Sequence, residues 1–230
     1  MKISGFQKLT LLDFPGSVAA TIFTPGCNFR CPFCHNAGLV LRCDEGEKYE
    51  EEEILSYLKK RCGVLDGVCI TGGEPLLQKD IDAFMAKVRE MGYKIKLDTN
   101  GSNPEKLRAL CEAGLVDYVA MDIKNSKEKY GAAVGLSDFG TSAVEESVAF
   151  LLSGRVDYEF RTTVVSELHT ERDIEDIAAW IKGAKRYFLQ NFVDSGHLIG
   201  ESLSAVSAEK LETMRKIASE YIDVVGVRGV

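Results

Sequence analysis

The stretch 17-SVAATIFTPGCNFRCPFC-34 joins an apolar run to three closely spaced cysteines. Its first eight residues are mostly apolar, which predicts a buried strand, and the Pro-Gly pair after them ends that strand. Cys27, Cys31 and Cys34 then follow with the spacing C-x3-C-x2-C. A short loop of this kind can wrap three thiolates around one corner of a metal cluster, and iron–sulfur clusters favour thiolate ligands. The stretch therefore predicts a strand with a metal-binding loop at its end.

A structural zinc site is the alternative that these three cysteines leave open. Zinc of that kind normally takes four protein ligands, often from two C-x2-C pairs. The chain has no second C-x2-C pair, and His35 is an awkward fourth ligand because it directly follows Cys34. Three thiolates leave one metal position open, which suits a site that binds a substrate at the metal. The pattern favours a catalytic cluster over zinc.

Composition and charge are those of an ordinary globular protein. Of 230 residues, 45% are hydrophobic and 27% are charged, and the net charge is −7. This acidity argues against a nucleic-acid or anionic-membrane partner, since both need a dense basic face. No apolar run approaches the ~18 residues of a membrane span, and no signal pattern opens the chain. We therefore expect a cytoplasmic protein, in which close-set cysteines more often bind metal than form disulfides.

Apolar runs alternate with amphipathic segments along the rest of the chain. Besides 17–24, strands are expected at 67–71, 94–97, 118–121, 158–165 and 187–191, with an edge strand at 222–227. Helices are expected at 50–62, 79–91, 104–113, 141–152, 170–181 and 207–220. Such alternation predicts one α/β domain, residues 1–230, with a parallel sheet covered by helices. An open doubly wound sheet and a barrel closed fully or in part both fit, and both place ligands at the carboxyl ends of the strands.

The loop CNFRCPFC resembles the signature of radical S-adenosylmethionine (SAM) enzymes, in which the aromatic residue before the third cysteine, here Phe33, packs by the adenine. The strand at 67–71 is followed by Gly72-Gly73-Glu74-Pro75. This resembles the family's GGEP motif, whose backbone and glutamate meet the SAM amino group. Paired glycines do allow close backbone approach to a ligand, and a carboxylate suits an ammonium.

The radical SAM resemblance implies a partial (β/α)6 barrel, open on one side, that holds one [4Fe–4S] cluster on the three cysteines. It also implies that the reduced cluster cleaves SAM to methionine and a 5′-deoxyadenosyl radical, which abstracts a hydrogen atom. The cofactor supplies this chemistry, while the protein orients it and excludes water and oxygen. The expected function is therefore that of a radical SAM oxidoreductase.

Two further motifs end the next two strands: Asp98-Thr99-Asn100-Gly within LDTNG, and Asp122-Ile-Lys124 within MDIK. They resemble elements of glycyl radical enzyme activases such as pyruvate formate-lyase activase. The resemblance implies that Asp98, Thr99 and Asp122 coordinate a monovalent cation, and that Lys124 lies near the SAM carboxylate. Asn100 is placed among the SAM-binding residues. Oxygen ligands suit a hard cation; the alternative for Asp98 is an ordinary turn aspartate before the Asn-Gly pair.

Later strands add two expected SAM-binding residues. Arg161 aligns with a SAM-contacting arginine, and Gln190 lies near a position where the family often has a histidine. The opening at 6–16 resembles activating proteins of anaerobic ribonucleoside-triphosphate reductase, although shorter reductase activases lack the last strands. The chain lacks the cysteine-rich insert of many other activases, so one cluster is expected, with Cys69 and Cys111 as small buried hydrophobes.

Three functions are compatible with these motifs. The first is an activase that abstracts a hydrogen from a glycine of a large glycyl radical enzyme, anaerobic ribonucleotide reductase, with flavodoxin or ferredoxin as electron donor. The second is a radical SAM enzyme for a small molecule, such as 7-carboxy-7-deazaguanine synthase, and the third is a non-catalytic cluster carrier. LDTNG with MDIK favours the first. The Gly-, Ser- and Lys-rich loop at 125–140 is predicted to contact the partner's glycine loop, with a plain solvated connection as the alternative.

Overall fold

A computed structural model describes residues 1–43, 45, 47–194 and 196–229 and shows one curved sheet of eight strands in chain order. The first strand pairs antiparallel with the second, and all later pairs are parallel. The strands are β1 (Gly5–Thr10), β2 (Ala19–Thr24), β3 (Gly67–Gly72), β4 (Lys94–Thr99), β5 (Tyr118–Asp122), β6 (Asp157–Val164), β7 (Tyr187–Asn191) and β8 (Val225–Arg228).

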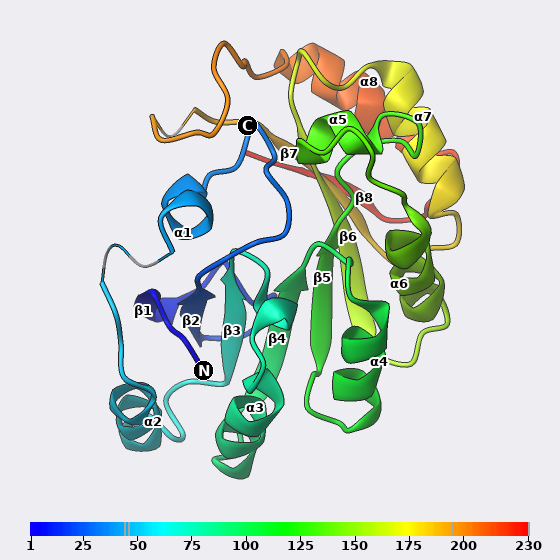
Figure 1. Cartoon of the computed structure of the whole chain (residues 1–230). Helices are drawn as coiled ribbons and strands as arrows, with labels where there is room; N and C mark the ends of the chain where they lie inside the picture. The colour runs from blue at the N-terminus through cyan, green and yellow to red at the C-terminus, as the bar shows by residue number, and fades with distance from the viewer. Residues whose placement is uncertain (44, 46, 195, 230) are drawn as a thin grey trace.

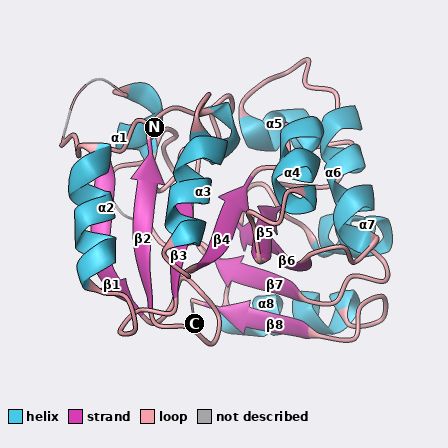
Figure 2. Cartoon of the chain, turned by 90° about the horizontal axis from the view of Figure 1, so that it is seen from below, coloured by secondary structure: helices cyan, strands magenta, loops and turns pink. Residues whose placement is uncertain are grey.

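The longer helices cover the convex side of this sheet, as Figure 1 and Figure 2 show: α2 (Glu51–Lys60), α3 (Ile81–Glu90), α4 (Pro104–Glu112), α6 (Ser142–Leu152), α7 (Glu171–Trp180) and α8 (Ala208–Ala218). Two short helices, α1 (Ala37–Leu41) and α5 (Tyr130–Val134), lie by the loops at the carboxyl ends of the strands, and a short 3-10 helix, η1 (Pro75–Leu77), follows β3. The edge strands β1 and β8 do not pair with each other in the described chain. The sequence allows an open doubly wound sheet or a barrel closed fully or in part, and the structure has a barrel that is closed only in part.

The predicted elements at 17–24 through 222–227 are confirmed, with ends that differ by a few residues. Local chemistry explains the clearest of them: Thr170 and Asp173 form the expected capping box at the start of α7. The prediction missed β1, α1 and α5. β1 is an edge strand with a largely exposed face, and both helices have only five residues, so none of them has a strong apolar period.

The two faces of the sheet differ in chemistry. Side chains that point outward, such as Ile22, Ile70 and Leu97, join the helices in one large apolar core. Because alternate residues of a strand point to opposite faces, their neighbours point into the barrel. Polar and charged groups predominate there: Thr21, Cys69, Lys96, Asp98, Asp122, Glu159 and Arg161. The partial barrel therefore has a polar interior that opens at the carboxyl ends of its strands.

Candidate functional site

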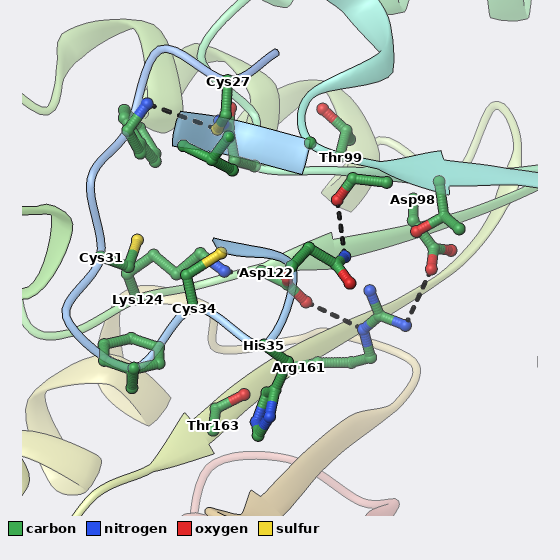
Figure 3. A pocket seen from close by; sticks show the side chains of 18 of the residues that line it. Cys27, Cys31, Cys34, His35, Asp98, Thr99, Asp122, Lys124, Arg161 and Thr163 are labelled. Carbon is green, nitrogen blue, oxygen red and sulfur yellow. Dashed lines mark hydrogen bonds and ion pairs between the residues drawn. The ribbon is translucent and has the colours of Figure 1, made fainter. Parts of the chain in front are cut away.

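A cavity lies at the carboxyl ends of strands β2 to β7 (Figure 3). Its empty space, open mouth included, is about 890 Å³. The cysteine loop forms one wall, and side chains from β3 to β7 form the other. The lining residues predicted from the sequence are Cys27, Cys31, Phe33, Cys34, Gly72, Gly73, Asp98, Thr99, Asn100, Asp122, Lys124, Arg161 and Gln190. The structure thus brings together thirteen of the fifteen sequence-predicted site residues.

The three cysteines of the loop are free thiols that border this cavity. Burial raises the pKa of the Cys27 thiol, and burial raises the pKa of Cys31 to about 12 despite the nearby Lys124 ammonium. Without a metal these two groups are therefore protonated thiols. Because thiolates are the metal-binding form, loading of a cluster must displace their protons.

Two segments hold the cysteine loop in place. The Arg30 amide donates to the carbonyl of Val134, at the end of α5, with an N–O distance of 2.8 Å. On the other side, the Gly200 amide donates to the Pro32 carbonyl, also at 2.8 Å. Gly135 has a φ of +71°, and a Cβ there would lie 2.3 Å from the Arg30 carbonyl oxygen. The 125–140 segment is thus an ordered support for the cysteine loop and contains α5.

Glu74 and Pro75 are the two predicted residues that do not line the cavity. Pro75 is buried at the start of η1. Glu74 is also fully buried, and its carboxylate accepts from the Thr99 hydroxyl at 2.8 Å and from the Asn100 amide at 2.7 Å. Burial raises the pKa of Glu74 to about 7 in spite of these hydrogen bonds. The contact of Glu74 with SAM stays a prediction, whereas its hydrogen bonds to the loop after β4 are present in the structure.

Five charged side chains from β4 to β6 and the residues just after β5 alternate in sign inside the barrel. Figure 3 shows four of them, Asp98, Arg161, Asp122 and Lys124. Lys96 pairs with Asp98 Oδ1, and Arg161 contacts Asp98 Oδ2 at 3.3 Å. The same guanidinium lies 2.9 Å from Asp122 Oδ1, and the Lys124 ammonium lies 2.9 Å from Asp122 Oδ2. Burial alone would raise the pKa of both carboxyls, but these cations hold each pKa below its usual range. Three cations thus face two carboxylates.

The remaining predicted residues have distinct surroundings. Phe33 is buried against the ring of His169, and the Lys124 ammonium lies 6.0 Å from its ring centroid. Asn100 places its amide nitrogen 3.8 Å from the sulfur of Cys27. Gln190 lines the cavity from β7. Cys69 is fully buried as expected, whereas Cys111 is only half-buried on α4.

Sequence reasoning overlooked Lys96, Asn36 and Thr163. Asn36 donates to the Gly72 carbonyl at 2.7 Å and so joins the cysteine loop to the paired glycines. Thr163 lines the cavity two residues after Arg161 on the same strand. The period of two was the available signal for Lys96 and Thr163, since each is two positions from a predicted site residue on a strand.

Comparisons with known proteins agree with this geometry. A profile of the Radical SAM superfamily matches residues 21–181, a range that includes the cysteine loop and β3 to β6. The chain belongs to the Radical SAM superfamily. It is 34% identical over 235 residues to a protein of Methanocaldococcus jannaschii, covering 99% of this chain and 96% of that one. That relative is named as a glycyl-radical enzyme activating enzyme, a name that is itself an inference.

More distant relatives include a 7-carboxy-7-deazaguanine synthase of Koribacter versatilis, 28% identical over 66% of this chain and 63% of that one. A domain of pyruvate-formate lyase-activating enzyme from Bacteroides vulgatus has a TM-score of 0.58, with 15% identity, 71% of this chain and 99% of that chain. Streptococcus suis SuiB bound to S-adenosylmethionine has a TM-score of 0.70, with 13% identity, 91% of this chain and 52% of that chain. At these structural identities the likeness shows the fold alone, and that fold is the expected partial barrel.

Membership in the superfamily implies a [4Fe–4S] cluster and SAM as cofactors. The donor set fits the cluster: three free thiols on one loop border one cavity, and thiolates are the usual ligands of such clusters. The donor set for the expected monovalent cation does not fit, because all four oxygens of Asp98 and Asp122 already contact protein cations. In the described residues, no helix is long and apolar enough to cross a membrane.

Proposed function

We propose that this radical SAM protein is an activase that abstracts a hydrogen atom from a glycine of a partner glycyl radical enzyme. One observation carries the proposal: the strand ends with the activase-like motifs, LDTNG and MDIK, line the same cavity as the three cysteines. The near full-length similarity to the Methanocaldococcus jannaschii protein supports it. The third expected function, a cluster carrier, does not need these charged strand ends.

In this proposal Cys27, Cys31 and Cys34 hold the cluster. When bound, the reduced cluster supplies the electron that cleaves SAM to the 5′-deoxyadenosyl radical. Phe33 and the backbone of Gly72-Gly73 border the cavity where the nucleoside and the amino-acid end of SAM would bind. Glycines suit the second role because they allow close backbone approach.

The charged side chains of the cavity orient the SAM carboxylate in this proposal. The five ion-paired side chains comprise three cations and two carboxylates, so together they have one positive charge in excess. Lys124 is the last cation in this series of ion pairs and lies beside the cysteine loop, near Phe33. A carboxylate is stabilised at such a position by a charge-assisted hydrogen bond. Asn100, Arg161 and Gln190 complete the proposed SAM-binding set.

The partner we propose is an anaerobic ribonucleotide reductase, with flavodoxin or ferredoxin as electron donor and a cytoplasmic location. The opening sequence at 6–16 supports this choice of partner. The exposed part of the 125–140 segment borders the mouth of the barrel and is the proposed contact for the partner's glycine loop. Since α5 supports the cysteine loop from within the same segment, partner contact and cluster support would be adjacent.

A small-molecule reaction is the second candidate, because the 7-carboxy-7-deazaguanine synthase of Koribacter versatilis matches two thirds of the chain. Two assays on the same reconstituted protein separate the two candidates. Reconstituted protein, reductant and SAM are mixed anaerobically with the reductase, and electron paramagnetic resonance is used to detect a glycyl radical. A signal that is absent from a reductase with its radical glycine replaced by alanine would support the activase. SAM cleavage without that signal, together with turnover of the synthase's substrate, would support the second candidate.

A further inference from the structure

The interior of the barrel contains a cation that no sequence motif predicted. Lys96 lies on β4, two residues before Asp98, and therefore points to the same inner face. Its side chain is only 2% exposed, although lysine is among the residues least often buried. Its ammonium contacts Asp98 Oδ1 and lies 3.7 Å from the sulfur of the fully buried Cys69. A buried charge of this kind requires a partner, and Asp98 is that partner.

The expected site for a monovalent cation is already filled with protein charges. Lys96 and Arg161 take the two oxygens of Asp98, and Arg161 and Lys124 take those of Asp122. A metal ion beside either carboxylate would face two cations at close range, and like charges repel. Each oxygen that a hard cation would use therefore already has a cationic partner, and it is this positive charge that disfavours a metal ion here.

The third expected ligand is also engaged elsewhere. The Thr99 hydroxyl donates to Glu74 Oε1 at 2.8 Å and accepts from the Gly101 amide at 3.1 Å. Thr99 follows Asp98 directly, so the two side chains leave the strand on opposite faces. The three expected ligands thus have no common free position for an ion.

We propose that the Lys96 ammonium is a built-in counter-ion for Asp98, so that this protein binds SAM without a bound monovalent metal ion. A tethered ammonium has the same charge as potassium, and its position does not depend on the salt in the medium. Lys96 is a positioning residue in this scheme: it holds Asp98, which orients Arg161 toward Asp122. The proposal rests on the proposed binding of SAM in this cavity.

The test uses the reconstituted holoenzyme in chloride salts of potassium, sodium or tetramethylammonium at equal ionic strength. Tetramethylammonium is too large for a carboxylate site inside the barrel. We expect the SAM dissociation constant of the wild type to change by less than about twofold among the three salts. Thallium(I), observed by its own nuclear magnetic resonance as a probe for potassium sites, should show no saturable binding to the wild type.

Lys96→Met removes the ammonium and leaves Asp98 with one unpaired oxygen. We expect SAM to bind this variant at least about fivefold more weakly in tetramethylammonium than in potassium. Thallium(I) should now bind saturably. The double variant K96M/D98N removes both charges and should lose the dependence on potassium. Lys94→Met is the matched control, since Lys94 is an exposed lysine on the same strand and should behave as the wild type.

Two results on the wild type alone would overturn the proposal: saturable thallium(I) binding, or SAM affinity that requires potassium. A folded K96M variant that is indifferent to potassium would also overturn it. If K96M does not fold, the wild-type measurements decide. Failure of the proposed function is a separate outcome, because a holoenzyme that binds no SAM in any salt would still give a clear thallium(I) result for the wild type and for K96M.

Discussion

The Thr99 hydroxyl donates a hydrogen bond of 2.8 Å to the buried carboxylate of Glu74, which joins the loop after β3 to the loop after β4. The other oxygen of Glu74 accepts from the backbone amide of Asn100 at 2.7 Å. The side-chain amide of Asn100 donates to the side-chain oxygen of Asn28, in the cysteine loop, at 3.0 Å. Hydrogen bonds beside the cavity therefore join three motifs that are far apart in the sequence: the cysteine loop, GGEP and LDTNG.

Glu74 should make the stability of the protein depend on pH. Burial raises its pKa from 4.5 to about 7 in the folded state. A carboxyl with a raised folded pKa contributes stability that is fully present below the unfolded pKa and is lost as pH rises through the folded one. The free energy of unfolding of the wild type, minus that of Glu74→Gln, should fall by roughly 3 kcal/mol between about pH 4.5 and pH 8.

Urea denaturation of the two proteins in parallel, under argon, measures this difference and cancels the titration of groups that they share. Near neutral pH the variant should also be less stable than the wild type by about 1–3 kcal/mol. The side-chain NH2 of the new glutamine faces the backbone N–H of Asn100 and leaves that donor without an acceptor. A stability difference that is constant across the pH range would show that Glu74 does not titrate there.

Replacement of a single cysteine of the loop should abolish the cluster. Cys27→Ala, Cys31→Ala or Cys34→Ala leaves two thiolates, which are too few to hold a [4Fe–4S] cluster. Iron content and the visible absorption of anaerobically reconstituted protein measure this loss. Cys62→Ala is the control, since Cys62 is exposed and does not line the cavity. Iron content in C62A as low as in the loop variants would point to another set of ligands.

Gly135 should be required for correct placement of the cysteine loop. Its φ of +71° disfavours other residues, and an added Cβ would lie 2.3 Å from the Arg30 carbonyl oxygen. Gly114 has a φ of +69° but nothing within 4 Å of the same position. Gly114→Ala should therefore have only the backbone cost of about 1 kcal/mol, while Gly135→Ala should also displace the loop. Thermal unfolding and the iron content after reconstitution compare them; equal losses in both variants would exclude a role for the close contact.

Much of this fold was predictable because the elements that build it are long and strongly periodic. The strand from Tyr187 to Asn191 was predicted to the residue, since its apolar start follows the charged pair at 185–186. The short helix Tyr130–Val134 was not predicted. Its buried residues pack against the cysteine loop, and that contact joins segments about a hundred residues apart in the sequence. No local pattern carries such information.

The candidate site shows the same division. The cysteines and the LDTNG and MDIK residues were found because each follows a predicted strand, and parallel strands bring their carboxyl ends together. The burial of Glu74 behind the cavity was not predictable, because it depends on donors from another loop. The pairing of Lys96 with Asp98 was missed for a different reason. Lysine at a strand position normally indicates an exposed face, and only a polar barrel interior reverses that rule.

Arg161 should be the most sensitive of the charged residues in the cavity. Arg161→Met would leave Asp98 and Asp122 without the guanidinium that bridges them at 3.3 and 2.9 Å. Breaking a buried ion pair from one side typically costs about 3–5 kcal/mol when the remaining charge is left unpaired. Asp98 keeps Lys96 and Asp122 keeps Lys124, so we expect a loss toward the lower end of that range. The surface pair of Arg155 and Glu112 is largely exposed, so Arg155→Met should change the free energy of unfolding by less than about 1 kcal/mol. Denaturation of the two variants gives the comparison, and similar small losses would mean that the interior charges are solvated rather than coupled.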